Sequence, residues 1–320
     1  MKIVVLDGYT LNPGDLSWQG LEHLGDVTVY DRTSQADIIP RAKEANLILT
    51  NKTPISAETI QACPKLKYIG VLATGFDQVD IHSAIQHEVV VTNIPTYGTA
   101  SVAQFTFALL LSLAHRVQKH SDAVHAGQWS ETSDFSFWLT PQIELQGKTM
   151  GIIGYGAIGE QVGKIANVMG MNVMAYRRSP GGTPPYERFE WATDLDQVFK
   201  CADIVSLHCP LTTETEGMIN RHTLSMMKKE ALLLNTARGK LIVEEDLAKA
   251  LDEKRIAGAA LDVLSTEPPQ AEHPLYGVKN CIMTPHMAWA SVEARTRLMN
   301  IAVNNAYQFL QGDPINVVNR

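Results

Sequence analysis

Short runs rich in valine and isoleucine alternate with amphipathic stretches along most of this chain, and this alternation limits the fold more than any other feature. Strand-length runs separated by helices predict parallel sheets that helices cover on both faces. Two series of strands are expected. The first comprises Lys2–Leu6, Leu47–Thr50, Tyr68–Val71 and Val89–Thr92. The second comprises Thr149–Ile153, Asn172–Tyr176, Asp203–His208, Ala231–Asn235, Ala257–Asp262 and Cys281–Thr284.

The stretch between the two series, roughly Thr99 to Ala126, is apolar nearly all round in its middle. We therefore expect one helix here, buried at a domain or subunit junction. An irregular segment rich in aromatic residues, Trp129 to Gln146, follows it, and such segments are usually functional or packed on a partner. A last amphipathic helix, from about Ser291 to Gln311, could return to the first series and make the first domain discontinuous.

Composition narrows the class of protein. The 320 residues carry a net charge of -7, which argues against binding to nucleic acid or to an anionic membrane. The longest apolar run, Phe105 to Ala114, is too short to span a bilayer, and the N-terminus does not read as a signal peptide. Four cysteines without a CxxC pair are too few for a disulfide scaffold and give no zinc knuckle. We predict a cytoplasmic protein with no metal.

A GxGxxG string follows the first strand of the second series directly and opens a helix, expected from Ile158 to Met169. This context is the one that dinucleotide binding requires. The first glycine allows a tight turn, the second allows the backbone to approach a pyrophosphate, and the third allows close packing of helix on strand. A structural glycine turn is the alternative. The predicted cofactor-binding residues of this loop are Gly154, Gly156, Ala157, Ile158 and Gly159.

The next strand ends without the acidic residue that would bind a ribose 2′-hydroxyl. Arg177 and Arg178 stand at that place instead. A guanidinium there suits a 2′-phosphate, because it can form charge-assisted hydrogen bonds with it. The sequence therefore favours NADP(H), with NAD(H) possible if Arg177 stacks on adenine or faces solvent.

Three ionisable residues come just after later strands of the same series. Arg238 follows one strand, Glu267 lies beyond Asp262 after the next, and His286 follows the last. The carboxyl ends of the strands of one open sheet form the edge where ligands bind. An arginine, a histidine and a carboxylate beside a nicotinamide suit the reduction of a 2-keto acid.

With these segments in this order, the chain resembles the D-isomer-specific 2-hydroxyacid dehydrogenases over essentially its whole length. Within that family it is most similar to the glycerate dehydrogenases, also called hydroxypyruvate reductases. The family resemblance includes the first-domain string Ala73 to Asp80. The similarity to that branch rests on Thr99 to Gln104, Phe135 to Trp138 and His286 to Ala290. One departure is Gln104, where the family often carries an acidic residue.

The catalytic roles follow from this reading. Arg238 would hold the substrate carboxylate and polarise the keto oxygen, since its planar fork suits both tasks. His286 would be the acid–base, and Glu267 would pair with the other imidazole nitrogen. The backbone N–H groups of Ala73, Thr74 and Gly75 would bind the substrate carboxylate as an anion-binding nest.

The remaining predicted contacts line the cofactor and the substrate. The resemblance implies that Asp262 meets the nicotinamide amide, with a structural role as the alternative. Pro210 is expected at the wall of the cofactor site, and Thr236 and Ala237 are assigned to the same site. Trp289 would contact the substrate. In relatives that use hydroxypyruvate or glyoxylate, aromatics at such places shape the pocket, one of them reaching across a dimer; Trp138 and Trp289 could do so here, or could be core aromatics.

The predicted fold is α/β with two doubly wound parallel-sheet domains. A Rossmann-type dinucleotide-binding domain, residues 99–286, would be inserted in a flavodoxin-like substrate-binding domain, residues 1–98 and 287–320. The predicted function is reduction of small 2-keto acids, hydroxypyruvate and glyoxylate, by a homodimer. The alternatives are a D-lactate-type dehydrogenase and a dinucleotide-sensing, corepressor-like binding protein.

Overall fold

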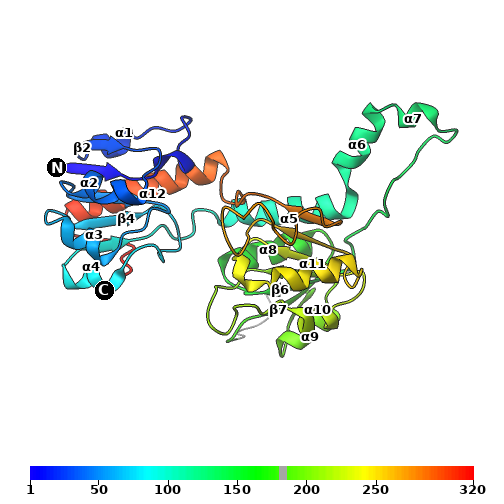
Figure 1. Cartoon of the computed structure of the whole chain (residues 1–320). Helices are drawn as coiled ribbons and strands as arrows, with labels where there is room; N and C mark the ends of the chain where they lie inside the picture. Colours follow the sequence, from blue (N-terminus) through cyan, green and yellow to red (C-terminus); the bar gives the residue numbers. More distant parts are fainter. Residues whose placement is uncertain (180–185) are drawn as a thin grey trace. The chain divides into compact units, whose positions relative to one another are not determined.

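The computed structural model describes residues 1–179 and 186–320, and it divides the chain into two compact units (Figure 1). Unit 1 contains Met1–Gly98 and Ala290–Arg320, and unit 2 contains Thr99–Trp289. The chain therefore returns from unit 2 to unit 1 after Trp289, whereas we expected this boundary after residue 286. The reason is local: the backbone N–H groups of Met287 and Ala288 donate to the buried Asp262 carboxylate of unit 2, at 2.9 and 2.8 Å.

Unit 1 is built on a parallel five-stranded sheet with the order β2-β1-β3-β4-β5. The order reverses between β1 and β3, as in a flavodoxin-like doubly wound sheet. The edge strand β2 was not expected from the sequence, since Asp26–Val29 has no fully buried residue and no apolar run. The strands are β1 (Lys2–Val5), β2 (Asp26–Val29), β3 (Leu47–Thr50), β4 (Tyr68–Val71) and β5 (Val90–Thr92).

Helices cover the unit 1 sheet, and the long C-terminal helix α12 (Val292–Leu310) is one of them. It packs on β4, where the Phe309 and Tyr68 rings lie 4.9 Å apart, and this contact gives the discontinuous domain its shared core. The other helices of unit 1 are α1 (Gln19–Glu22), α2 (Ile38–Ala42), α3 (Ala57–Ala62) and α4 (Ile81–Gln86), with short 3-10 turns η1 (Gly8–Thr10) and η2 (Gln35–Asp37).

Unit 2 contains a parallel seven-stranded sheet with the order β12-β11-β10-β9-β6-β7-β8. The order reverses between β6 and β9, which is the Rossmann arrangement, and the predicted fold class is confirmed. The short edge strand β8 was not expected from the sequence. The strands are β6 (Thr149–Ile153), β7 (Asn172–Tyr176), β8 (Phe189–Trp191), β9 (Ile204–Leu207), β10 (Leu232–Asn235), β11 (Gly258–Leu261) and β12 (Cys281–Met283).

The apolar stretch expected as one helix is two helices, α5 (Thr99–His115) and α6 (Val117–His125), bent by 54°. The break falls at Arg116, which adopts the left-handed conformation with φ of 49° and so ends α5. Only α5 packs in the core, against α8, β10 and β11, while α6 and the short α7 (Gln128–Glu131) extend away from the sheet (Figure 1). Among the described residues, no single helix is long and apolar enough to cross a membrane.

The remaining helices of unit 2 cover its sheet and include α10, whose first residues line a surface hollow. They are α8 (Ala157–Val168), α9 (Leu195–Cys201), α10 (Arg221–Met226), α11 (Glu244–Asp252) and the 3-10 turn η3 (Gly239–Leu241).

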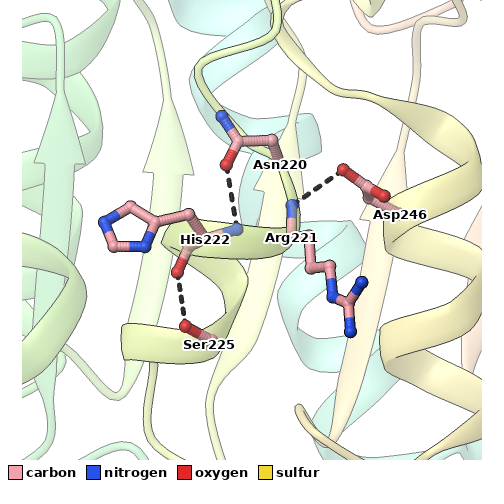
Figure 2. Close-up of a pocket in the computed structure, with 5 residues that line it drawn as sticks. All are labelled: Asn220, Arg221, His222, Ser225 and Asp246. Carbon is pink, nitrogen blue, oxygen red and sulfur yellow. Dashed lines mark hydrogen bonds between the residues drawn. The ribbon is translucent and has the colours of Figure 1, made fainter.

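Figure 2 shows the hollow at the start of α10, where Asn220 Oδ1 accepts from His222 N and Asp246 accepts from Arg221 N. These bonds cap the helix, and none of the lining residues is a predicted site residue.

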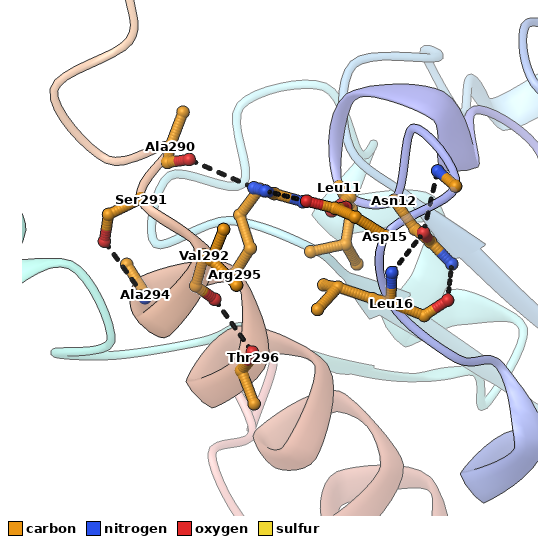
Figure 3. Close-up of polar contacts among 11 residues, drawn as sticks. Leu11, Asn12, Asp15, Leu16, Ala290, Ser291, Val292, Ala294, Arg295 and Thr296 are labelled. Carbon is orange, nitrogen blue, oxygen red and sulfur yellow. Dashed lines mark hydrogen bonds and ion pairs between the residues drawn. The ribbon is translucent and has the colours of Figure 1, made fainter.

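The start of α12 is fixed to the N-terminal part of unit 1 by the buried Arg295 (Figure 3). Its guanidinium donates to both carboxylate oxygens of Asp15, at 2.7 and 2.6 Å, and also to the carbonyl oxygens of Leu11 and Ala290. These hydrogen bonds hold the pKa of Asp15 below its usual range. A bidentate, charge-assisted contact between residues 280 positions apart thus closes the discontinuous domain.

Candidate active site

One edge of the unit 2 sheet gathers most of the residues that the sequence singled out. Because all its strands are parallel, the segments that follow them start at the same edge. These segments are the glycine loop after β6, Arg177 and Arg178 after β7, Pro210 beyond β9, Thr236 to Arg238 after β10, Asp262 after β11 and His286 after β12. The edge includes the switch point between β6 and β9, the usual ligand position in such sheets.

The three glycines of the loop differ in the space around them. A Cβ at Gly154 would lie 2.4 Å from Cys209 N, and a Cβ at Gly159 would lie 2.2 Å from Gly154 O, so internal packing excludes side chains at both positions. A Cβ at the exposed Gly156 would meet nothing within 4 Å. Gly156 is also the N-cap of α8, where helix N–H groups lack intrahelical partners. The open space at a helix N-terminus fits a pyrophosphate.

The two arginines after β7 differ in their surroundings. The Arg177 guanidinium lies over the Trp191 ring of the neighbouring strand β8, 4.9 Å from its centroid. Arg178 is mostly exposed and lies 3.7 Å from Glu214 in an exposed ion pair, an arrangement that contributes little to stability. Both residues directly follow the last residue of β7.

Arg238 stands in a turn that a buried asparagine organises. Asn235, at the end of β10, accepts from Ala237 N at 3.0 Å and donates to Arg238 O at 2.8 Å. Thr236 Oγ1 lies 3.1 Å from Thr106 Oγ1 of α5. The Arg238 side chain is exposed, and its Nη1 donates to Ala237 O at 2.8 Å. The turn presents the guanidinium at the sheet edge on a fixed backbone.

His286 and Glu267 form the predicted pair. His286 Nδ1 and Glu267 Oε2 lie 2.6 Å apart, and both side chains are about one-third exposed, at 32% and 34%. The other carboxylate oxygen of Glu267 accepts from Leu264 N at 3.0 Å. The carboxylate thus sets the orientation of the ring and directs Nε2 away from the pair, as a catalytic acid–base requires.

Asp262 holds the segment that carries His286. Its side chain is buried, and besides the N–H groups of Met287 and Ala288 its carboxylate accepts from Thr284 Oγ1 at 2.6 Å. His286 N donates to Asp262 O at 2.8 Å, and His286 itself takes a φ of 51°. Asp262 therefore has the structural role that was its alternative, and its contact with the nicotinamide amide stays a prediction.

A histidine and a cysteine, His208 and Cys209, follow β9. Burial lowers the pKa of His208 to about 4 and raises the pKa of the Cys209 thiol to about 11, so both are neutral near pH 7. His208 Nε2 lies 2.8 Å from Ser206 Oγ. No group of three or more potential metal ligands occurs within residues 1–179 and 186–320. Pro210 is exposed, and its carbonyl accepts from Thr215 Oγ1.

Unit 1 contains the remaining predicted substrate residues, in the loop that follows β4. Ala73 O accepts from Ile94 N at 2.9 Å, Thr74 Oγ1 donates to Ile94 O at 2.8 Å, and Asn93 Nδ2 donates to Thr74 O. Thr74 is exposed, and Ala73 and Gly75 are partly exposed. In unit 2, Trp289 Nε1 donates to His286 O at 2.8 Å, which ties this aromatic residue to the histidine segment.

Sequence reasoning missed several residues whose hydrogen bonds fix the segments at this edge. Asn235 was seen only as part of a motif, and Thr284, Glu244 and His273 were not assigned a function. The signal for Asn235 was available, since asparagine followed by a turn often hydrogen-bonds its own backbone two residues on. The other three depend on long-range contacts that no local pattern shows.

A Rossmann-ordered sheet with an open glycine loop, and with an arginine and a histidine–glutamate pair on the same edge, defines a dinucleotide-dependent oxidoreductase. Residues 107–288 match the family described as "D-isomer specific 2-hydroxyacid dehydrogenase, NAD binding domain". The chain is 51% identical to a hydroxypyruvate reductase of Blautia hydrogenotrophica, over 100% of both chains, and 35% identical to a glycerate dehydrogenase of Methylorubrum extorquens, over 99% and 98%. The chain belongs to the D-isomer-specific 2-hydroxyacid dehydrogenase family.

A solved structure with a similar fold is also found. An acyclic imino acid reductase in complex with NADPH and D-Arg is 31% identical, with a TM-score of 0.85 over 99% of this chain and 100% of that one. The predicted resemblance and the predicted enzyme class are both confirmed.

Proposed function

We propose that this enzyme reduces hydroxypyruvate and glyoxylate to D-glycerate and glycolate, with NADPH as its preferred cofactor. The observation that carries the proposal is the 2.6 Å contact between His286 Nδ1 and Glu267, on the same sheet edge as Arg238 and the glycine loop. The 51% identity to a hydroxypyruvate reductase over the full chain supports the substrate class.

The open space at Gly156 supports binding of the cofactor pyrophosphate at the N-terminus of α8. Arg177 and Arg178 would bind the ribose 2′-phosphate, and Asp262 would meet the nicotinamide amide. When bound, the nicotinamide supplies the hydride. The residues proposed to hold the cofactor are Gly154, Gly156, Ala157, Ile158, Gly159, Arg177, Arg178, Pro210, Thr236, Ala237 and Asp262.

In the proposed reduction, Arg238 binds the substrate carboxylate and polarises the keto oxygen. The protonated His286 donates its Nε2 proton to that oxygen as negative charge develops on it, and Glu267 on Nδ1 holds the ring in place. The backbone N–H groups of Ala73, Thr74 and Gly75 bind the carboxylate, and Trp289 contacts the substrate. In the oxidative direction the imidazole takes the proton back.

The test is a rate measurement with the wild-type protein and separate solutions of hydroxypyruvate, glyoxylate, pyruvate and 2-ketoisocaproate, each with NADPH and with NADH. We expect the highest kcat/KM with hydroxypyruvate or glyoxylate and NADPH. Preference for pyruvate would identify a D-lactate-type enzyme. Cofactor binding without turnover of any of the four would contradict the proposal and favour a dinucleotide-sensing protein.

Replacing both arginines after β7 by glutamine is expected to reverse the cofactor preference. Loss of at least two charged hydrogen bonds to a 2′-phosphate, each worth about 1.5–3 kcal/mol, should lower kcat/KM for NADPH roughly 10²- to 10⁴-fold. The value for NADH should stay within about twofold, because NADH lacks the 2′-phosphate that these guanidinium groups would bind. Steady-state kinetics with each cofactor measures this, with Arg221→Gln as a control at an exposed arginine elsewhere in unit 2. An equal loss with both cofactors would reject the phosphate role.

We also propose that the enzyme is a cytoplasmic homodimer. Large apolar side chains are exposed on α6, α7 and the segment that follows: Val117, Val124, Trp129, Phe135, Trp138 and Leu139. Phe135 is 91% exposed, and we infer that these side chains, which come from one stretch of the chain, form the dimer contact. The four cysteines are free thiols, as expected in a reducing compartment.

Light scattering should give a mass of twice the 35.2 kDa chain for the wild type and a lower mass for Phe135→Asp. The matched control is Val168→Asp, which changes a residue 87% exposed on α8 and should leave the dimer intact. A wild-type mass of one chain at micromolar concentration would disprove the dimer.

A further inference from the structure

A buried carboxylate at the start of α11 lies outside the residues assigned to catalysis. Glu244 is only 7% exposed, although an unpaired buried carboxylate is costly. It accepts from the backbone N–H of Ser265 at 2.8 Å and from the Ser265 hydroxyl at 2.5 Å, and it contacts His273 Nε2 at 3.2 Å. The contacts with Ser265 fix the position of a segment that otherwise has no helix or strand.

The hydrogen bonds of the His273 ring indicate one tautomer. Its Nδ1 accepts a hydrogen bond from Leu275 N at 3.3 Å, so the ring proton is on Nε2 and is donated to Glu244. The side chain is only 6% exposed. Glu244 therefore receives hydrogen bonds from three donors and holds both the beginning and the end of the loop from Ser265 to His273.

This loop carries Glu267 and adjoins the turn of Arg238. Leu264 N, one residue before Ser265, donates to Glu267 Oε1, and Glu267 Oε2 contacts His286 Nδ1 at 2.6 Å. On its other side, the backbone of Leu264 and Ser265 packs on Gly239, where a Cβ would lie 1.9 Å from Leu264 C. The segment anchored by Glu244 therefore contacts both Gly239, the residue after Arg238, and Glu267, the partner of His286.

We propose that Glu244 and His273 are a positioning pair that holds Glu267 on His286 and thereby fixes the tautomer of the catalytic imidazole. The proposal rests on the role of His286 given under the proposed function. The hydrogen bond made by one ring nitrogen sets the protonation of the other. Displacement of Glu267 would therefore allow the proton of the neutral His286 ring to move from Nδ1 to Nε2. A displacement of a few tenths of an ångström is enough to matter, because catalytic groups must be held within about 0.5 Å of their productive geometry.

Glu244→Gln tests the pair with little change in volume. The amide has only one acceptor oxygen, so whichever way it turns, its NH2 group faces either the Ser265 N–H donor or the His273 Nε2–H donor, and the two donors repel each other. We expect kcat for hydroxypyruvate reduction to fall about tenfold, with KM for NADPH unchanged. We also expect ¹⁵N spectra of labelled histidine to show a gain of the Nε2–H tautomer at His286, identified by the signal missing from His286→Ala. Glu245→Gln, at the neighbouring exposed residue of α11, should match the wild type in both measurements.

Ser265→Ala is a second variant that keeps Glu244 and removes only the hydroxyl contact, and it should show a smaller change in the same direction. If folded Glu244→Gln or Ser265→Ala keeps wild-type kcat and the wild-type tautomer, the proposal is overturned. A fall in kcat with an unchanged His286 tautomer overturns it as well, because the loss would not act through Glu267. The spectra need no turnover, so an inactive wild type would refute the proposed function and still leave the positioning role measurable.

Discussion

His286→Ala is expected to lower kcat for keto-acid reduction about 10²–10⁴-fold, the range typical for loss of a general acid. The keto oxygen gains negative charge as the hydride arrives, and without the imidazolium only water can protonate it. Binding of NADPH should be unchanged, because the glycine loop and the arginines after β7 do not depend on this side chain. Steady-state kinetics, together with NADPH fluorescence titration, separates the two effects.

The control for this variant is His222→Ala, which removes an exposed histidine at the start of α10. Glu267→Gln should give a smaller loss than His286→Ala, since the amide oxygen can still accept from Nδ1 but carries no charge. A His286→Ala enzyme with near-full activity would exclude the acid–base role. A loss of NADPH binding equal to the loss of kcat would show that the residue supports the fold and not the reaction.

Arg238→Lys is expected to lower kcat/KM for hydroxypyruvate about 10²–10³-fold, although the charge is conserved. Lysine has a point charge on a flexible stem and cannot offer two parallel N–H donors to a carboxylate while polarising the adjacent carbonyl. Both KM and kcat should change, because the guanidinium binds the carboxylate in the ground state and stabilises developing charge in the transition state.

The matched control is Arg221→Lys, an exposed arginine of the same unit that takes no part in the proposed reaction. The same kinetics with hydroxypyruvate as the varied substrate measure both variants. Retention of the wild-type KM in Arg238→Lys would assign the substrate carboxylate to another cation, and we would then withdraw the double role of Arg238.

The parallel sheets were predictable because their central strands are buried on both faces and so read as continuous apolar runs. Two edge strands were missed for the converse reason: Asp26–Val29 and Phe189–Trp191 are partly exposed and pair on one side only. The break at Arg116 was also missed, because no proline or glycine separates α5 from α6 in the sequence. A left-handed arginine has no sequence signal of its own.

Some residues of the candidate site were predicted from the sequence, and others were not. The contact between His286 and Glu267 was predicted from strand order and family resemblance, and the structure places the two side chains 2.6 Å apart. Asp262 was predicted as a cofactor contact, while its carboxylate is occupied by Thr284 and two backbone N–H groups. Glu244 and His273 were not identified at all, because their hydrogen bonds join residues 21 and 29 positions apart. Motifs show the groups that face a ligand, but not the buried groups that support them.

The most direct test of the proposed function is the identity of the product formed from hydroxypyruvate and NADPH by the wild-type enzyme. Chiral chromatography of the reaction mixture should show D-glycerate, in an amount equal to the NADPH oxidised. L-glycerate, or no glycerate with NADPH bound and unoxidised, would contradict the account.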